Sequence, residues 1–412
     1  MPGFRYSVAS IDSTKANTMQ KHFVFAICGC LFLSGVFAQT PEIDGILQQI
    51  EQNNRELQAI SSYLEGRKLE LKSGNNLPDP QFGFFYLPNG DNSTGDYTEF
   101  QVSQTIEFPT VYGARGTLIE EQETQLELEY LSRRQEILLR AKGHGLELIY
   151  LNKRIATEQE RLEQARTVMD QVEELYRREQ NGILELNKAK VAWLQDQFKV
   201  QQLENERRNV RLLLQNLNGG TPLKIEGSEF SGTLDIADLD VLWQDRLVHD
   251  ADLVLIRQEE VIAAQALAVS RNKSLPNLTA GYNQQGVPGA IYSGLYAGIS
   301  LPLWSNRNKV KSARSHLEFQ EVNSTRKTQE ARTRFEKQVN EYQMMLSRYR
   351  EYQTTLSGMD SESLLMEAYQ LGEISFMDYY RELQFYRDAY DSMIKMEYEL
   401  FRQQAELLKH KL

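Results

Sequence analysis

The chain has 412 residues, a formal net charge of -11 and a hydrophobic content of 41%. An acidic chain without a basic patch does not suit a nucleic-acid surface, so we expect no nucleic-acid partner. Beyond the N-terminal segment, no stretch of the sequence is apolar enough for a transmembrane helix.

The N-terminus has the pattern of a secretory signal peptide. Lys21 precedes an apolar run at residues 23–38, and the small side chains of Val36 and Ala38 form a cleavage site before Gln39. We therefore expect the protein to be exported. A short membrane anchor is the alternative interpretation, although the run is short for a membrane span.

This interpretation assigns residues 1–38 to the signal peptide. It takes Met19 as the translation start and residues 1–18 as an upstream extension. Both cysteines of the chain lie inside the apolar run, and Gln39 stands where a lipoprotein would carry a cysteine. We therefore expect a mature chain without cysteine and without a lipid anchor.

The mature chain contains two copies of one plan. The sequence LPDPQFGFFY, which begins at Leu77, resembles LPNLTAGYNQ, which begins at Leu275, and NGILEL at Asn181 resembles LGEISF at Leu371. The spacing between matching segments is nearly constant. A repeat this long is not a short solenoid period but a duplication of a whole structural unit.

Each copy is predicted to contain a helix, a β-hairpin and a long helical hairpin. The first copy covers residues 39–217, with a helix at 42–73, a β-hairpin at 80–107, and long and return helices at 113–180 and 183–217. The second copy covers residues 242–412, with a helix at 242–272, a β-hairpin at 277–301, and long and return helices at 306–370 and 373–411. Residues 218–241, which begin with a Gly-, Pro- and Ser-rich stretch, form an equatorial linker between the copies.

The predicted hairpins alternate apolar and polar residues, which is typical of strands with two different faces. Strands of about ten residues are long enough to cross a bilayer when they are tilted. The residues expected to face lipid are Val102, Ile106, Leu295 and Ile299. The residues expected to face a lumen are Gln101, Thr105, Gly298 and Ser300.

The predicted helices carry narrow apolar stripes with heptad spacing, which is typical of coiled coils. We interpret these stripes as helix–helix contacts. The two long helices would each measure roughly 100 Å, and the shorter helices would match that length if they stack end to end in pairs. The stripes are Ile155, Leu162, Met169 and Tyr176; Phe335, Tyr342, Tyr349 and Leu356; and Tyr380, Ile394, Phe401 and Leu408.

Gly182 and Gly372 stand between the long and return helices, where glycine suits a left-handed turn. Ser375 is expected to cap the following helix, with Asp378 in a capping-box-like position. These turns are either simple hairpin closures or a surface for a partner. The candidate partner contacts are Gly182, Leu184, Leu186, Gly372, Ile374 and Phe376. The acidic residues expected beside these turns are Glu185, Glu373 and Asp378.

Four strands cannot close a barrel in a membrane, and lipid does not tolerate an open sheet edge. The strands must therefore be completed by other copies of the chain. Two copies would supply eight strands, and three copies would supply twelve.

The duplicated order of these elements resembles the TolC-type outer-membrane efflux channels, and the resemblance covers nearly all of the mature chain. It rests on the Leu-Pro strand entries at Leu77 and Leu275, the strand exits before Pro109 and Pro302, and the glycines of the two turns. The compact length and short strand loops are most similar to the heavy-metal-resistance branch. Many relatives carry a lipid-anchored cysteine, from which this chain departs.

The resemblance implies a mainly α fold with a small β part. Long coiled-coil helical hairpins would form an α-barrel, and two β-hairpins per chain would contribute four strands to a trimeric, twelve-stranded transmembrane β-barrel. It also implies an outer-membrane homotrimer with a long periplasmic extension. The turns of the three chains would then form its mouth, where Glu185, Glu373 and Asp378 are the candidate ring of carboxylates that favours cations. Its partners would be outer-membrane lipid, a periplasmic adaptor and an inner-membrane pump of the resistance-nodulation-division type.

The sequence has no glycine-rich phosphate loop, nucleophile elbow or Cys/His zinc spacing. We therefore predict no enzymatic activity, no cofactor and no metal site. His144, His249, His316 and His410 are scattered along the sequence, and Met344, Met345, Met393 and Met396 fit helix packing better than soft-metal binding.

Two alternative functions remain open from the sequence. The protein could be a secreted or periplasmic coiled-coil adaptor without a membrane barrel, or it could be a periplasmic enzyme.

Overall fold

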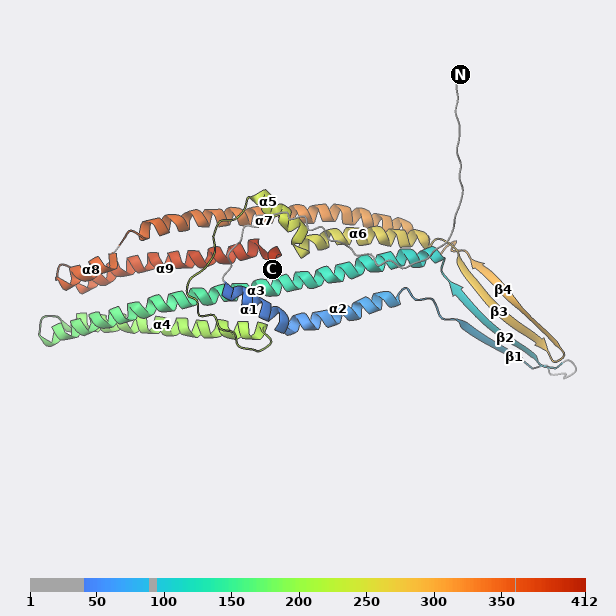
Figure 1. Ribbon diagram of the computed structural model, residues 1–412, viewed down its shortest axis with the longest axis horizontal. Coiled ribbons are helices and arrows are strands. Elements are labelled where there is room, and N and C mark those ends of the chain that lie inside the picture. The colour runs from blue at the N-terminus through green and yellow to red at the C-terminus, as the bar shows by residue number, and fades with distance from the viewer. Residues whose placement is uncertain (1–40, 89–94, 360) are drawn as a thin grey trace, which may run out of the picture. The chain divides into compact units, whose positions relative to one another are not determined.

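The computed structural model of the chain describes residues 41–88, 95–359 and 361–412. Within these ranges, long helices run side by side, and a four-stranded sheet lies at one end of them (Figure 1). The expected signal peptide, its cleavage site and Met19 lie outside the described residues. Among the described helices, none is long and apolar enough to span a membrane.

The first half of the chain has the expected order of elements. α3 begins at Pro109 rather than at residue 113, because proline suits the first turn of a helix, where its missing N–H is not needed. It ends at Arg177 rather than at residue 180. The elements are α1 (Pro41–Asn53), α2 (Arg55–Ser73), β1 (Gln81–Leu87), β2 (Tyr97–Ile106), α3 (Pro109–Arg177) and α4 (Ile183–Leu217).

The second half repeats this order. Its return helix begins at Phe376 rather than at residue 373, because Ser375 caps it. The elements are α5 (Leu239–His249), α6 (Ala251–Asn272), β3 (Asn277–Val287), β4 (Ala290–Ser300), α7 (Lys309–Leu356), α8 (Ser361–Gln370), α9 (Phe376–Leu407) and a short 3-10 turn, η1 (Lys409–Lys411).

The helices predicted at 42–73 and 242–272 are each broken in two, so both predictions of a single helix were wrong. The breaks fall at Asn54 and Asp250, whose backbones are extended and whose side chains cap α2 and α6. Asn54 Oδ1 accepts a hydrogen bond from Leu57 N at 3.0 Å. Asparagine and aspartate are strong N-cap residues, so each one starts a new helix inside a continuous apolar pattern.

The long helix predicted at 306–370 is also interrupted. α7 ends at Leu356 and α8 begins at Ser361. Ser357 and Gly358 follow the last turn of α7, and glycine in a helix interior costs about 1 kcal/mol relative to alanine. α3 has no such interruption, so the two halves differ here.

The predicted end-to-end stacking of shorter helices is present in the first half. Asn54 Nδ2 donates to Leu217 O at 2.8 Å, which joins the start of α2 to the last turn of α4. In the second half, Gln135 of α3 donates to His249 O at 3.1 Å and to His410 O at 3.4 Å. The buried side chain of Gln135 therefore links the junction of α5 and α6 to η1, the short turn that follows α9.

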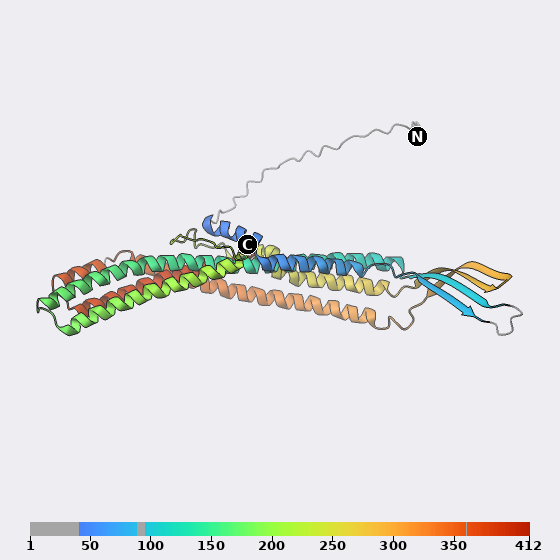
Figure 2. The same cartoon turned by 90° about the horizontal axis from the view of Figure 1, so that it is seen from below.

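The four strands form one antiparallel sheet in the order β1-β2-β3-β4. The two hairpins pair through β2 and β3, with Val102 opposite Tyr282. Figures 1 and 2 both place the sheet at one end of the helices and the α3–α4 and α8–α9 turns at the other end. The register fixes which residues share a face of the sheet.

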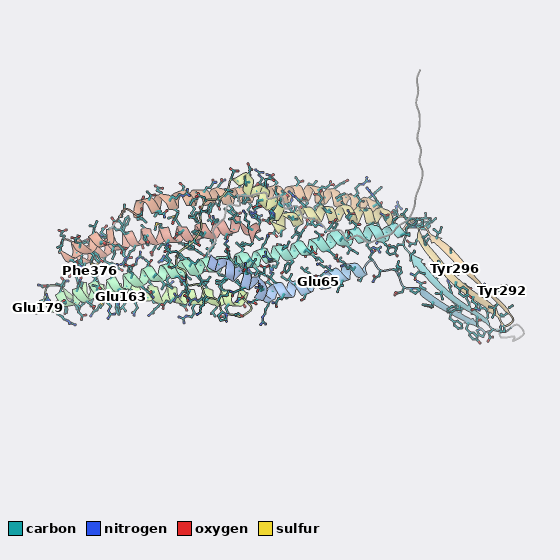
Figure 3. The ribbon with its side chains drawn as sticks, in the orientation of Figure 1. Glu65, Glu163, Glu179, Tyr292, Tyr296 and Phe376 are labelled. Atoms are coloured by element: carbon teal, nitrogen blue, oxygen red, sulfur yellow. The ribbon has the colours of Figure 1, made fainter. Side chains whose placement is uncertain are left out.

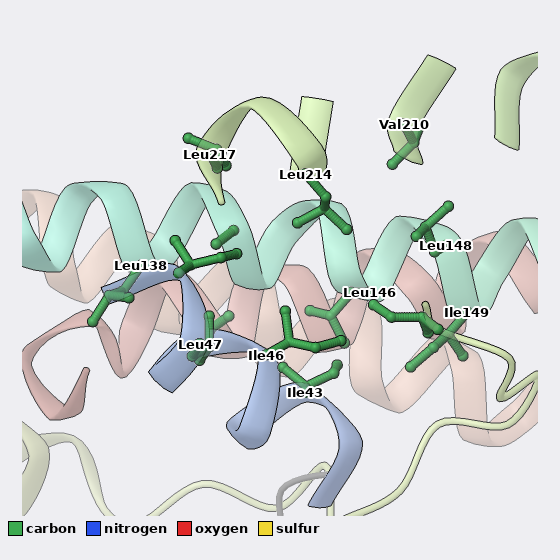
Figure 4. Packing of buried hydrophobic residues seen from close by; sticks show 14 of the residues in the cluster. Ile43, Ile46, Leu47, Leu138, Leu146, Leu148, Ile149, Val210, Leu214 and Leu217 are labelled. Atoms are coloured by element: carbon green, nitrogen blue, oxygen red, sulfur yellow. The ribbon is translucent and has the colours of Figure 1, made fainter. Parts of the chain in front are cut away.

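Among the described residues, buried apolar side chains form three clusters along the helices. The largest packs α1 against α3 and α4, with Ile50, Ile149 and Leu214 almost fully buried (Figure 4). Gly145 belongs to this contact, because a Cβ on it would lie 3.6 Å from Ile43. The linker contributes Ile225, whose side chain is fully buried in the same cluster.

The predicted apolar stripe of α7 is confirmed for Phe335, Tyr342 and Tyr349, which are buried, whereas Leu356 at the end of the helix is half-buried. The stripe predicted for α3 is only partly correct. Ile155 is buried, but Tyr176 is 38% exposed. The buried face of α3 instead includes the charged residues Arg154, Glu158 and Arg161, together with Val168 and Val172.

Candidate functional site

The sheet has two chemically different faces. In an antiparallel sheet, directly paired residues share a face, and each strand alternates between the two faces. By this register one face carries Phe82, Phe84, Phe100, Val102, Ile106, Leu278, Tyr282, Leu295 and Ile299. The four residues expected to face lipid therefore lie on one apolar face. The four residues expected to face a lumen lie together on the opposite face.

The apolar face is uncovered in the single chain. Leu295 is 88% exposed, Phe82 is 72% exposed and Ile299 is 70% exposed. Soluble monomers rarely expose a continuous apolar patch of this kind. The face therefore requires an apolar environment or a partner.

The opposite face carries polar side chains that bond across the strands. Gln101 Nε2 donates to Tyr296 Oη at 2.5 Å, and the hydroxyls of Thr105 and Thr279 lie 2.8 Å apart. Figure 3 shows Tyr292 and Tyr296 on β4. Phe85 and Leu87 of β1 also lie on this face, but its side chains in β2 and β3 are mostly polar and hydrogen-bonded, which suits contact with water.

The outer strands β1 and β4 each have one neighbour in the sheet. Each therefore presents a row of unpaired backbone N–H and C=O groups along its outer edge. Such edges are templates for pairing with another chain. Both edges of the sheet are thus open to pairing with a further strand.

The turn between α3 and α4 differs from the prediction. Gly182 has φ -80° and is the N-cap of α4, so it is not in a left-handed conformation. The left-handed residue is Glu179, with φ 62°. Gln180 N donates to Leu175 O at 2.9 Å, which is the hydrogen bond that closes a helix around such a residue.

The turn between α8 and α9 agrees with the prediction. Gly372 has φ 76°, and Glu373 N donates to Ala368 O at 3.0 Å. Ser375 Oγ accepts from Asp378 N at 3.2 Å, so Ser375 caps α9. The hydrogen bond with the Ser375 hydroxyl lowers the pKa of the Asp378 carboxyl, and the positive charge of Arg381 lowers it further.

The hydrogen bonds align the two turns differently from the sequence motif. Glu179 corresponds to Gly372, and Gly182 corresponds to Ser375, because each pair has the same backbone role. The motif had matched Gly182 with Gly372, and that pairing was wrong. Glycine at an N-cap and glycine in a left-handed turn look alike in sequence.

The side chains beside the turns have different exposures. Leu184 is 70% exposed, whereas Leu186 and Phe376 are each 5% exposed. Leu186 and Phe376 belong to a cluster that joins the two helical hairpins, with Ile374 packed against it. The structure therefore leaves Leu184 available on the surface and uses Leu186 and Phe376 for packing.

A cavity of about 450 Å³ lies between the two turns. Figure 3 shows Glu179 and Phe376 at this end of the molecule. Burial, and to a lesser extent the charge of Glu185, raises the pKa of Tyr369 in the cavity wall. The lining includes Glu174, Arg178, Glu185, Tyr369, Gly372, Ile374 and Phe376.

The three acidic candidates have different surroundings. Glu373 is exposed, and Glu185 lines the cavity. Asp378 lies 3.0 Å from Arg381, which neutralises part of its charge. Within one chain, these carboxylates therefore form no common cluster.

Sequence reasoning missed a buried charge network between the two halves of the chain. Glu158 is 1% exposed and lies 2.8 Å from Arg161 and 2.9 Å from Lys199. Asp391 of α9 lies 2.9 Å from Arg154. The sequence does show Arg154, Glu158 and Arg161 at helical spacing, so they were expected to share one face of the helix. Charged residues on a helix usually face solvent, however, and the sequence did not show that this face is buried.

The part of the chain that the structure describes contains no cluster of acidic, cysteine or histidine residues that could hold a metal ion. His144 lies 3.2 Å from Glu147, and His410 lies 3.0 Å from Asp245. Met345, Met393 and Met396 pack against an apolar cluster, whereas Met344 is 65% exposed.

No protein-family model matches the chain, and no curated protein matches it. Solved structures do match. The chain is similar to CusC, whose structures concern folding and transmembrane channel formation, at 13% identity and a TM-score of 0.76 over 91% of this chain and 92% of that chain. It is similar to the CmeC outer membrane channel of Campylobacter jejuni at 14% identity and a TM-score of 0.71, over 90% and 85% of the two chains.

The outer membrane protein VceC of Vibrio cholerae is a further match, with 14% identity and a TM-score of 0.71 over 89% of this chain and 95% of that chain. Identities this low establish the fold. The chain has the fold of the TolC-type channels, with long helical hairpins and a small sheet in a duplicated order, as the sequence predicted.

Proposed function

We propose that this protein is the outer-membrane channel of a tripartite efflux system. The observation that carries the proposal is the sheet. It has an exposed apolar face, an opposite polar face and two open edges, and it lies at one end of long helices. A membrane surrounds the apolar face, and water fills the space beside the polar face.

The open edges of the sheet support assembly as a homotrimer. If β1 of one copy pairs with β4 of the next, every edge is satisfied and no strand is exposed to lipid. Three copies supply twelve strands around one lumen. The helices then continue the tube into the periplasm as an α-barrel.

The turns at the far end of the helices are the proposed contact surface for a periplasmic adaptor and an inner-membrane pump. The cavity between the two turns and the exposed Leu184 support this role. Of the residues expected to contact a partner, Gly182, Leu184 and Gly372 are exposed and would touch it directly. Leu186, Ile374 and Phe376 would support the surface from the cluster beneath it. The residues of the acidic mouth are Glu185, Glu373 and Asp378.

The assembly is tested on the purified full-length protein. We expect it to fractionate with the outer membrane, to migrate on a denaturing gel in a heat-dependent manner, and to have the mass of a trimer in detergent. Reconstituted into a planar bilayer, it should give discrete single-channel currents. A folded monomer in the soluble periplasmic fraction would instead support a coiled-coil adaptor and would contradict the channel.

The role of the turns is tested separately with Gly372→Pro. Proline cannot adopt the left-handed φ of Gly372, so the α8–α9 turn should be distorted. We expect trimers to reach the outer membrane while efflux and crosslinking to the adaptor are lost. Full transport and full crosslinking in this variant would show that the turns only close the hairpins.

A further inference from the structure

The four described strands contain a single charged residue, Glu99 in β2. It is the third residue of β2, close to the end of the sheet that is remote from the helices. Its register partners are Gln285 of β3 and Phe85 of β1, and it shares its face of β2 with Gln101 and Thr105. Glu99 therefore lies on the polar face of the sheet.

The carboxylate of Glu99 is held in place by neutral donors. Asn283 Nδ2 donates to Oε1 at 2.6 Å, and the hydroxyl of Tyr97 donates to Oε2 at 3.2 Å. None of the described basic residues forms an ion pair with it. Glu107, which follows the end of β2, is by contrast paired with Arg115. The negative charge of Glu99 is thus positioned without being neutralised.

We propose that Glu99 makes the channel selective for cations at the end remote from the turns. This inference rests on the proposed function, in which the polar face lines the lumen. A trimer would then place three copies of Glu99 at one level, and a ring of carboxylates concentrates cations and repels anions. The cargo class that this ring favours is inorganic or organic cations.

The aromatic side chains on the same face extend the preference for cations. Tyr292 is 71% exposed, and Tyr296 lies on the same face of β4. The faces of tyrosine rings attract cations, and this attraction adds to that of a carboxylate. The four described strands contain no positive side chain that would oppose it.

The test is the reversal potential of single channels in a KCl gradient, for the full-length protein and for Glu99→Gln. The glutamine keeps an acceptor for Asn283, so the sheet should assemble normally. We expect the permeability ratio of K⁺ to Cl⁻ to fall roughly twofold in 0.1 M salt. The fall should be several-fold in 0.01 M salt, because the screening length grows from about 10 Å to about 30 Å.

A second variant separates charge from local structure. Ser103 lies on the same face of β2, so Glu99→Gln combined with Ser103→Glu restores one carboxylate per chain at a different level. This double variant should regain cation selectivity. Conducting Glu99→Gln channels with an unchanged permeability ratio would overturn the inference and leave the proposed function intact. Wild-type protein that never conducts would overturn both.

Discussion

Arg161 of α3 lies 2.8 Å from Asp391 of α9, so a largely buried ion pair joins the two halves of the chain. Arg154 and Lys199 also contact Asp391, at 2.9 Å and 3.1 Å. Burial opposes ionisation of Asp391, but the attraction of Arg161, Arg154 and Lys199 outweighs it and lowers the pKa of that carboxyl. The carboxyl of Asp391 is therefore ionised at neutral pH.

Asp391→Ala should destabilise the helical part strongly. Removing one partner of a buried pair costs about 3–5 kcal/mol, and we expect the lower end because Glu158 still faces the same cations. The measurement is the denaturant midpoint of the purified assembly. The control is Glu173→Ala, whose exposed i,i+4 pair with Arg177 should be worth only about 0.3–0.5 kcal/mol. Equal shifts for both variants would contradict the network.

His410 should make stability depend on pH. Burial lowers its pKa below 6.5, although Asp245, at 3.0 Å, partly offsets the effect. The unfolded chain takes up a proton near pH 6.5, whereas the folded chain does so only at lower pH. The contribution of neutral His410 is thus complete above pH 6.5 and is lost as the pH falls toward the folded pKa.

His410→Gln should therefore flatten the dependence of the unfolding midpoint on pH between about 7.5 and 5.5, the range that surrounds the ordinary histidine pKa. His316→Gln, a change on the exposed surface of α7, is the matched control. The prediction fails if His410→Gln retains the wild-type slope.

The two faces of the sheet can be distinguished at adjacent positions of β2. Val102→Arg should block trimer assembly, because an arginine on a lipid face near the membrane centre costs about 2–4 kcal/mol. Gln101→Arg, on the opposite face, should leave assembly intact. Heat-dependent gel migration of outer-membrane fractions measures the yield of each variant. Equal yields would refute the assignment of the faces.

Gly281 should be intolerant of a side chain. A Cβ there would meet the ring of Tyr296 and lie 2.7 Å from Val102 O, so Gly281→Ala forces the strands apart. Overpacking of this kind typically costs about 1–3 kcal/mol. Gly294→Ala is the control, since a Cβ on Gly294 meets nothing within 4 Å. Thermal unfolding of the assembled protein should show a loss for the first variant only.

The two turns should respond oppositely to substitution. Gly372→Ala should cost about 1–2 kcal/mol, because an L-residue is strained in the left-handed region. Glu179→Gly relieves the same strain and should stabilise its turn by about 0.5 kcal/mol or more, after the entropy of glycine is subtracted. Gly182→Ala should cost less, about 0.5 kcal/mol, because its φ suits any residue but alanine is a poorer N-cap than glycine. Amide hydrogen exchange at each turn is the measurement, and protection lost in Gly182→Ala but kept in Gly372→Ala would reverse our assignment.

The faces of the sheet were predictable from sequence because alternation along a strand does not depend on the rest of the protein. The breaks at Asn54 and Asp250 were not predicted, since the apolar pattern continues through them. The sequence pattern that marks each break is an N-cap residue followed two residues later by an acidic residue in the first turn of the new helix, Glu56 in α2 and Asp252 in α6.

The left-handed turn at Glu179 could not have been found, because glutamate carries no preference for that conformation. The sequence instead drew attention to Gly182, three residues later. The buried charges of α3 were also beyond prediction, because their partners Lys199 and Asp391 come from α4 and α9, which are distant in the sequence. Tertiary contacts between distant segments decide both features.

α3 has 69 residues and therefore measures roughly 104 Å. Among the described helices it alone runs uninterrupted from the sheet to the turns, since α2 meets α4 at Asn54, α6 begins beside the chain end that follows α9, and α7 stops at Leu356. Of the described helices, α3 alone therefore connects the sheet to the turns through one unbroken series of backbone hydrogen bonds, and the other helices reach that length only through the contacts at their capped junctions.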